Sequence, residues 1–405
     1  MSSVARQDQH NYYTSVPEKR LSEGVGCYFS LSWAGAAREP RGRAAMAAFG
    51  AAAPASLTNP NNDVMVSEPP NDGISSIALS PAALAPKNYL VAGTWDNEVR
   101  CYEIGSNGAT TPVGLIKHAG PVLDVAWSPD GQTIVSASCD KTANMWSVAT
   151  QQSQPVAAHA AAIKAIAYIG DLGAGSPAVV TGSWDKTVKY WDVRAPTGQP
   201  MGTVNMSERV YAMDVRAPLM VVGTADRKLL VYDIRRPTAP FHEKVSQLKY
   251  QTRCVSTFAD GTGYAVGSVE GRVSIDHVSE ADRSKDFAFK CHRDGDGTAH
   301  AVNSIAFHQT YGTFATAGAD GNFTFWDKDA KQRLKQFAKM DAPISATAFN
   351  HDGTIFAYAA SYDWSKGAAA HNPATARNNI FLHAVADAEI RSKPKSSNTR
   401  GGGRR

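Results

Sequence analysis

The sequence has few of the features that mark secreted, membrane-spanning or disordered proteins. Its five cysteines include no CxxC pair and are odd in number, which favours reduced thiols inside a cell over a disulfide framework. The most apolar early stretch, residues 44–55, is far shorter than the roughly 20 residues that a membrane helix needs. Hydrophobic residues make up 43% of the chain and charged residues 19%, which argues against general disorder. We therefore expect a folded protein without a membrane segment.

Acidic residues are scarce at both ends of the chain. Residues 391–405 contain six basic and no acidic side chains, and residues 1–56 contain six basic and four acidic ones, whereas the formal net charge of the whole chain is only +4. The stretch 57–390 is therefore slightly acidic. Strong unaided binding of duplex nucleic acid by this stretch is not expected, because such binding depends on basic charge.

Signatures of catalysis and of metal binding are also missing. No phosphate-binding or dinucleotide-binding fingerprint stands between a strand and a helix. Residues 294–297 (DGDG) resemble the start of a calcium loop, but no glutamate occupies the position that would complete it. Cys291 and His292 lack a second ligand pair at zinc spacing. We expect no enzymatic activity, no metal and no cofactor.

What the sequence does contain is an internal repeat. Six segments share small residues, an acidic turn residue and then alternating apolar positions, with the acidic residues 41 to 50 positions apart at Asp96, Asp140, Asp185, Asp226, Glu270 and Asp320. A seventh, weaker match follows at Asp363. Six residues after the acidic residue stands an aromatic ring in every one of the six segments except the fifth, where Asp276 replaces it. A repeat of roughly 40 to 45 residues with this pattern predicts the four-stranded blades of a β-propeller.

The repeat predicts an all-β, seven-bladed WD-repeat β-propeller over residues 57–390. A propeller must close its ring, because an open last blade would leave unpaired strand edges. We expect residues 62–66 to supply the outer strand of blade seven, beside a strand formed by residues 379–385. Residues 1–56 are predicted to be a flexible N-terminal tail and residues 391–405 a disordered basic tail. The predicted blades lie near residues 72–104, 118–148, 159–193, 207–234, 251–278, 300–327 and 342–385.

The repeats resemble the WD-repeat family, in which a His, a Ser or Thr, the turn Asp and a Trp of one blade are linked by hydrogen bonds. The resemblance assigns these structural roles in blade two to His118, Ser136 or Ser138, Asp140 and Trp146; in blade three to His159, Thr181 or Ser183, Asp185 and Trp191; and in blade six to His300, Thr316, Asp320 and Trp326.

Several runs go beyond the generic repeat and cover all seven predicted blades in order: GPVLDVAWSPDG, SASCDKTANMW, TGSWDKTVKYWD, GSVEGRV, FKCHR, AVNSIAFH, FWDKDA and AYAASYDWSKG. These runs closely resemble the WD-repeat mRNA export factors of the nuclear pore, over about residues 62–390. The resemblance implies a protein of the nucleus and nuclear pore complex that shuttles to the cytoplasm. It also implies a role in export of poly(A) mRNA, and a further role in mitotic spindle function.

The same resemblance implies the partners and the residues that bind them. Members of this family capture the GLEBS motif, a short hairpin-forming segment of a phenylalanine-glycine nucleoporin, so a GLEBS-motif nucleoporin is the expected partner. Arg272 is the expected ion-pair partner of acidic residues in the motif. Phe289, Trp326 and Lys328 match a family pocket that grips an apolar side chain, and Asp327 and Arg333 would border it. Single-stranded RNA is expected only as part of a complex.

Two other interpretations remain open at this stage. One is a spindle-checkpoint propeller of kinetochores, a related protein that binds GLEBS-like peptides and other checkpoint proteins. The other is a generic WD-repeat scaffold. The runs SYDWSKG and FWDKDA favour the export factor.

Overall fold

The computed structural model describes residues 57–171, 177–194, 198–372 and 376–392. The predicted flexible tail 1–56 and residues 393–405 of the predicted basic tail lie outside the described residues. Within the described residues almost all regular structure is β-strand, and the single α-helix, α1 (Asp387–Ile390), is four residues long. No helix there is long and apolar enough to cross a membrane.

Pro54–Asp363 and Pro373–Arg405 make up the larger of two compact units. The smaller unit includes Trp364–Asn372, where a single helical turn, η4 (Ala368–Ala370), brings the rings of Trp364 and His371 to 4.8 Å. All of the strands belong to the larger unit.

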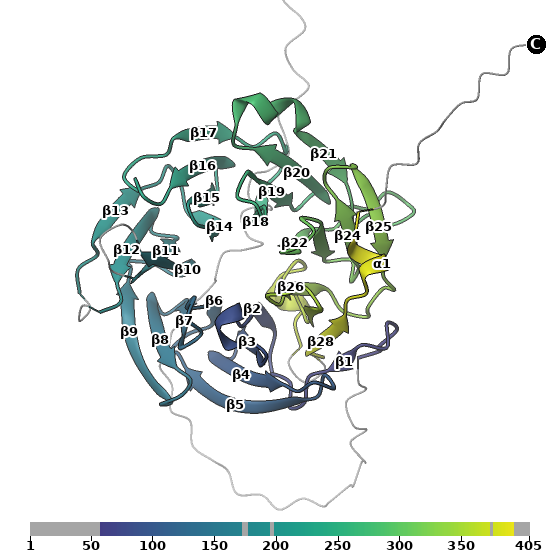
Figure 1. The fold of residues 1–405 in the computed structure, drawn as a ribbon, viewed down its shortest axis with the longest axis horizontal. Helices are drawn as coiled ribbons and strands as arrows, with labels where there is room; N and C mark the ends of the chain where they lie inside the picture. The colour runs from purple at the N-terminus through teal and green to yellow at the C-terminus, as the bar shows by residue number, and fades with distance from the viewer. Residues whose placement is uncertain (1–56, 172–176, 195–197, 373–375, 393–405) are drawn as a thin grey trace, which may run out of the picture. The chain divides into compact units, whose positions relative to one another are not determined.

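The larger unit is a ring of seven four-stranded antiparallel sheets, which confirms the predicted seven-bladed propeller (Figure 1). Six blades are formed by four consecutive strands each. Blade one contains β2 (Ile74–Leu79), β3 (Asn88–Thr94), β4 (Glu98–Ile104) and β5 (Thr110–Lys117); blade two β6 (Val122–Trp127), β7 (Thr133–Ser138), β8 (Thr142–Ser147) and β9 (Gln152–Ala158); and blade three β10 (Ile163–Asp171), β11 (Pro177–Ser183), β12 (Thr187–Asp192) and β13 (Gly202–Asn205).

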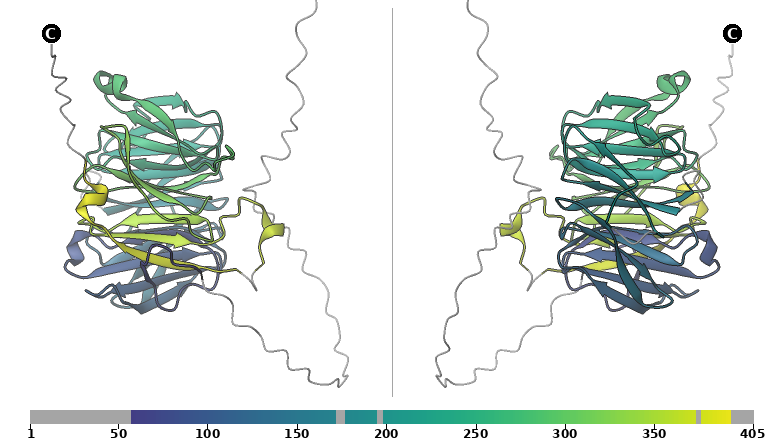
Figure 2. Two further views of the ribbon diagram at one scale, coloured as in Figure 1. Left: turned by 90° about the vertical axis from the view of Figure 1, so that its right-hand side faces the viewer. Right: turned by 90° about the vertical axis from the view of Figure 1, so that its left-hand side faces the viewer.

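The next three blades repeat this order, and their strands cross the ring from face to face in the side views (Figure 2). Blade four contains β14 (Val210–Arg216), β15 (Leu219–Thr224), β16 (Lys228–Asp233) and β17 (His242–Val245); blade five β18 (Thr252–Thr257), β19 (Gly263–Ser268), β20 (Arg272–His277) and β21 (Phe287–Lys290); and blade six β22 (Val302–Phe307), β23 (Phe314–Gly318), β24 (Phe323–Asp327) and β25 (Gln332–Gln336). Short 3-10 turns lie in two connections, η2 (Ala82–Leu84) and η3 (Glu280–Lys285).

Blade seven joins the two ends of the described chain. Its strands are β26 (Ile344–Phe349), β27 (Ile355–Ala360), β28 (Asn379–Ala384) and, at the outer edge, β1 (Val64–Met65). Val64 pairs with Leu382 and Met65 with Phe381, so the outer strand is formed by two residues of the segment 62–66 that was expected to close the ring. Because β1 fills the edge that β28 would otherwise expose, the ring has no unpaired strand at its junction.

A hydrogen-bonded cluster fastens this junction. His383 of β28 lies with Nδ1 2.6 Å from Asp63 Oδ1 and with Nε2 2.9 Å from Glu389 Oε2. The Tyr358 hydroxyl donates to Asp63 Oδ2 at 2.8 Å. Although burial alone would lower the pKa of His383, the hydrogen bonds from Asp63 and Glu389 raise it. One side chain thus holds the residue before β1 and the helix after β28 together.

Strand burial explains how far each blade extends. The second strands are buried almost throughout, as in β15 and β19, whereas the fourth strands β13, β17 and β21 alternate between partly buried and exposed positions. The predicted blade ranges end before the fourth strand, because a half-exposed strand carries a weak hydrophobic pattern. For the same reason Gln332–Gln336, expected in the connection from blade six to blade seven, is instead strand β25.

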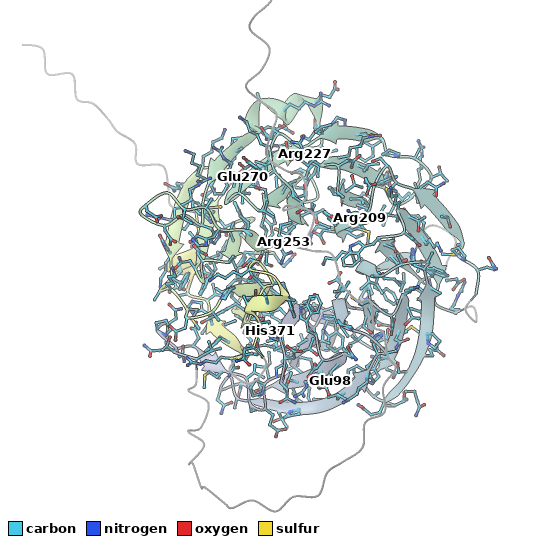
Figure 3. All side chains as sticks on the ribbon, turned by 180° about the vertical axis from the view of Figure 1, so that it is seen from behind. Glu98, Arg209, Arg227, Arg253, Glu270 and His371 are labelled. Carbon is cyan, nitrogen blue, oxygen red and sulfur yellow. The ribbon has the colours of Figure 1, made fainter. Side chains whose placement is uncertain are left out.

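The hydrophobic core lies between neighbouring blades. One cluster combines Val273 of blade five with Phe314 of blade six, and another combines Phe325 of blade six with Phe356 of blade seven. Leu57 and Ile390, at the two limits predicted for the propeller, both pack into this second cluster. The acidic turn between the second and third strands lies at one face of the ring, here called the turn face; Figure 3 labels Arg227 and Glu270 of these turns.

Candidate partner-binding site between blades five and six

The site lies beside the network of His, Ser or Thr, turn Asp and Trp in blade six. Blades two and three contain the same kind of network. In blade two, His118 Nδ1 lies 3.1 Å from Asp140 Oδ2 and Nε2 lies 2.8 Å from the Ser136 hydroxyl. In blade three, His159 lies 2.8 Å from Asp185 and 2.7 Å from the Thr181 hydroxyl. These bonds choose Ser136 and Thr181 over the alternatives Ser138 and Ser183, which bond to backbone groups instead.

The tryptophan link differs between these two blades. The Trp191 indole donates to the Thr181 hydroxyl at 2.8 Å and completes a four-member network in blade three. The Trp146 indole in blade two is fully buried, but its N–H has no hydrogen-bond partner. Trp146 therefore acts through packing alone.

In blade six the histidine of the network is His292, and the prediction of His300 was wrong. His292 Nδ1 lies 2.8 Å from Asp320 Oδ1 and Nε2 2.9 Å from the Thr316 hydroxyl, to which Trp326 also donates at 2.9 Å. His300 instead pairs with Asp294 at the surface. The physical reason is that His292 follows the outer strand of blade five after one residue, Cys291, close to the position that His118 and His159 occupy directly after the outer strands before them.

Trp326 combines this structural role with exposure. Its counterparts Trp146 and Trp191 are 0% and 3% exposed, whereas Trp326 is only partly buried. The ring of Phe289 on β21 lies 4.7 Å from the ring of Trp326, centroid to centroid. Phe289 and Trp326 therefore form an aromatic pair at the edge of the core between blades five and six.

A cavity of about 210 Å³ opens beside this pair, between β21 and β25. Three cations line it, Lys290, Arg293 and Arg333, together with Cys291, His292, Asp320, Asn322, Thr324, Trp326 and Gln336. Burial alone would raise the pKa of Asp320, but hydrogen bonds from His292 and Asn322 outweigh it and lower that pKa. Because Asp320 is held within the network, the cations give the cavity a net positive character.

Asp327, which was predicted to border the pocket, and Lys328, which was predicted to form part of it, are both largely buried. Asp327 is 4% exposed, and its Oδ1 accepts the backbone N–H groups of Asp329 and Ala330 in the turn before β25. Lys328 is 8% exposed, with its ammonium 5.0 Å from the centre of the Phe258 ring and 2.9 Å from Asp329. Both side chains make contacts within the turn before β25, and the border role of Asp327 and the pocket role of Lys328 stay predictions.

Arg333 and Arg272 lie on different sides of blade five. Arg333 is exposed beside the cavity and donates to Gln336 at 2.7 Å. On β20, Val273 belongs to the core shared with blade six, so the adjacent Arg272 points to the opposite side of the sheet. There its Nε lies 3.6 Å from Glu270. A single apolar side chain cannot contact Arg272 and Trp326 together, but an extended segment crossing blade five can.

Two cations that line the cavity were not predicted as part of the site. Lys290 and Arg293 line the cavity, and Lys331 lies 4.6 Å from the centre of the Phe287 ring. Lys290 directly follows the alternating Phe287 and Phe289, which was a usable signal, because a strand that turns alternate aromatic side chains toward the core presents its other positions to solvent.

Neither catalysis nor metal binding is suggested by the chemistry of the site. Burial raises the pKa of the Cys291 thiol, so this group is not an activated nucleophile. Within residues 57–171, 177–194, 198–372 and 376–392, no group of three or more His, Cys, Asp or Glu side chains could hold a metal ion. The cavity instead combines one aromatic ring, that of Trp326, with mostly polar and charged side chains.

Comparison with known proteins gives a consistent result. Residues 110–147, 151–192 and 289–327 match the WD domain, G-beta repeat family. The chain is 49% identical over 353 residues to protein RAE1 of Arabidopsis thaliana, covering 86% of this chain and 98% of that protein. It is 47% identical over 357 residues to the poly(A)+ RNA export protein of Schizosaccharomyces pombe, covering 86% and 99%. It is 46% identical over 348 residues to the mRNA export factor of Xenopus tropicalis, covering 83% and 93%.

Proposed function

This chain belongs to the family of WD-repeat mRNA export factors, which are not enzymes, and we propose that it captures the GLEBS motif of a nucleoporin at the nuclear pore. In this role it is a binding platform that links cargo mRNA to the pore. The cavity beside Trp326 is the observation that carries the proposal.

Two features of the cavity support peptide capture. Trp326 is partly exposed although its counterparts in blades two and three are buried, and its ring, which packs against Phe289, lines the cavity. An apolar side chain inserted there would be desolvated on several sides, which is how anchor residues of interfaces gain most of their energy. Lys290, Arg293 and Arg333 around it favour a segment with acidic residues next to the anchor.

Arg272 supplies a second point of attachment in this proposal. It is 35% exposed and lies on the side of blade five that faces blade four. An acidic residue of the bound segment would compete with Glu270 for the Arg272 guanidinium. Two separated contacts fix the direction in which the segment crosses blade five.

The cellular role follows from the names of the relatives, an mRNA export factor and a poly(A)+ RNA export protein. We propose that this chain acts in the nucleus and at the nuclear pore complex, and that it shuttles to the cytoplasm with exported mRNA. Single-stranded RNA would bind to the assembled complex, because residues 57–390 are slightly acidic by themselves. A further role in mitotic spindle function belongs to the same proposal.

Calorimetric titration of the full chain with a GLEBS peptide tests the docking site. We expect a dissociation constant of about micromolar or lower, and a weakening of about tenfold or more for Arg333→Glu and for Arg272→Glu, because each places a carboxylate where an acidic partner docks. Arg235→Glu is the matched control, since Arg235 is an exposed arginine in the third-to-fourth strand connection of blade four. Absence of binding by the folded wild-type chain would overturn the proposal.

A spindle-checkpoint propeller and a generic WD-repeat scaffold are the competing functions. The export names of the relatives favour the first proposal over both. Affinity capture from cell extract, with the Arg333→Glu variant as the negative control, separates them. A pore nucleoporin lost with the variant supports the export function, checkpoint proteins lost with it support the kinetochore, and an unaffected set of partners supports a scaffold.

A further inference from the structure

The innermost strand of every blade carries the same irregularity. In each blade the register with the second strand shifts after the first residue of the innermost strand, which leaves one bulged residue next to the turn face. Bulges redirect a side chain and commonly lie beside functional sites. The seven bulged residues are Ser75, Leu123, Lys164, Tyr211, Arg253, Asn303 and Ser345.

Two of these seven residues are cations, and neither has an acidic partner. No carboxylate in the part of the chain that the structure describes lies within ion-pair distance of Lys164 or Arg253. Arg253 donates to neutral oxygens, Asn303 Oδ1 at 3.2 Å and the Asp363 carbonyl at 3.3 Å. Figure 3 places Arg253 at the inner edge of the ring.

Lys164 makes no hydrogen bond to any described residue, although Asp124 of blade two is near enough to attract it. The Asp124 carboxylate is already occupied: one oxygen accepts from the Ser76 hydroxyl at 2.8 Å and from its neighbour Val125, and the other accepts the Ile166 N–H at 2.9 Å. Burial lowers the pKa of Lys164, Asp124 offsets part of this, and the charge of Arg253 lowers the pKa further. Arg253 is thus close enough to Lys164 for the two positive charges to repel each other.

A neutral donor at the same end of the ring is also without a partner. The indole N–H of Trp184 is buried and has no acceptor. The backbone N–H of Trp184 donates to the Ala162 carbonyl, two residues before Lys164, which places this residue beside the start of β10. Buried donors without acceptors are rare in folded proteins.

We propose that the turn-face end of the ring's centre binds an oxyanion, a carboxylate or a phosphate, with Lys164 and Arg253 as its cationic ligands. Such a group would accept charge-assisted hydrogen bonds from both side chains, and the indole N–H of Trp184 is a neutral donor without a partner near the start of β10. A carboxylate would come from an acidic segment lying on the turn face, and this source rests on the docking proposed above. A free or covalently attached phosphate would bind independently of that docking.

Titration of the full chain with inorganic phosphate in chloride buffer, followed by calorimetry and thermal unfolding, tests the site. Lys164→Met removes the charge at similar length, and we expect it to weaken phosphate binding about tenfold, as does Arg253→Gln. Lys141→Met is the matched control, because Lys141 is an exposed lysine in a turn of the same face. Equal losses for Lys141→Met and Lys164→Met would reveal diffuse attraction and overturn the proposal.

The second arm uses the GLEBS peptide and its variants with single Glu→Gln changes. If phosphate does not bind, one Glu→Gln peptide must lose affinity for the wild-type chain but not for Lys164→Met, which identifies a carboxylate as the ligand. If the peptide binds both proteins equally with every change, and phosphate does not bind, the site proposal fails while the docking function stands. If neither protein binds the peptide, the phosphate arm alone decides.

Discussion

Blades three and six contain the same network but use it differently. In both, a histidine bridges the turn aspartate and a threonine, and a tryptophan donates to that threonine. Trp191 of blade three is 3% exposed, whereas Trp326 of blade six is partly exposed beside a cavity with three cations. The same hydrogen-bond network can therefore hold one tryptophan in the core and leave its counterpart in another blade accessible at a cavity.

The largest expected effect separates the two tryptophans. Trp191→Ala should lower the free energy of unfolding by about 3–5 kcal/mol, because it empties a fully packed site. Trp326→Ala should lower it by only about 1–3 kcal/mol, since part of the ring is already in solvent. Urea unfolding followed by circular dichroism measures both.

Peptide titration of the same two variants sharpens the difference. We expect Trp326→Ala to lose GLEBS peptide binding and the folded fraction of Trp191→Ala to retain it. If both variants lose equal stability and bind the peptide equally, Trp326 has only the structural role of Trp191.

A smaller effect distinguishes the two histidines near blade six. His292→Ala removes the hydrogen bonds of His292 to Asp320 and to the Thr316 hydroxyl, which keep only their bonds from Asn322 and Trp326, and should cost about 2–3 kcal/mol of unfolding free energy. His300→Ala removes only a surface pair with Asp294 and should cost about 0.5 kcal/mol or less. Thermal and urea unfolding of both variants provide the measurement, and the reverse order would show that His300 belongs to the network.

The smallest expected effect is a difference in how stability depends on pH between His159 of blade three and His383 of blade seven. Burial lowers the pKa of His159 despite the bond to Asp185, so the unfolded chain binds the proton first and stability falls as pH drops below about 6.5. His383 has the opposite sign: two carboxylates raise its pKa, so its contribution is full below about pH 6.5 and is lost as pH rises through the folded value.

Unfolding free energies measured from pH 5.5 to 8.5 should therefore change in opposite directions for two variants. Relative to wild type, His159→Gln should lose least at low pH and His383→Gln should lose most there. Parallel profiles for the two variants would contradict the opposite environments that the structure gives these histidines.

Much of the fold could be predicted from the sequence, because each blade has a recognisable pattern within about 45 consecutive residues. The acidic turn residues and the alternating second strands carry strong signals, and the strand near residues 62–66 followed from the need to close the ring. The outer strands were harder to predict, because half-exposed strands such as β25 have little hydrophobic alternation.

The site was only partly predictable, because several of its contacts join residues that are far apart in the sequence. His292 and His300 are eight residues apart, and only the end of β21 shows that His292 occupies the position of His118 and His159. Whether Lys328 is exposed depends on Phe258, 70 residues earlier in the chain. Asp276 looked like a missing aromatic ring, but it is a buried carboxylate paired with Lys244 of blade four and bonded to Ser274.

The junction in blade seven determines which blade can fold last during synthesis. Blades one to six each consist of consecutive strands, so each can form soon after its last strand leaves the ribosome. Blade seven must wait, because Asp63 and His383 lie 320 residues apart in the chain. At about 5–20 residues per second, this interval is on the order of 15–60 s. During that time β1 has no partner, and the nascent chain exposes a strand edge that a chaperone or a neighbouring chain can occupy.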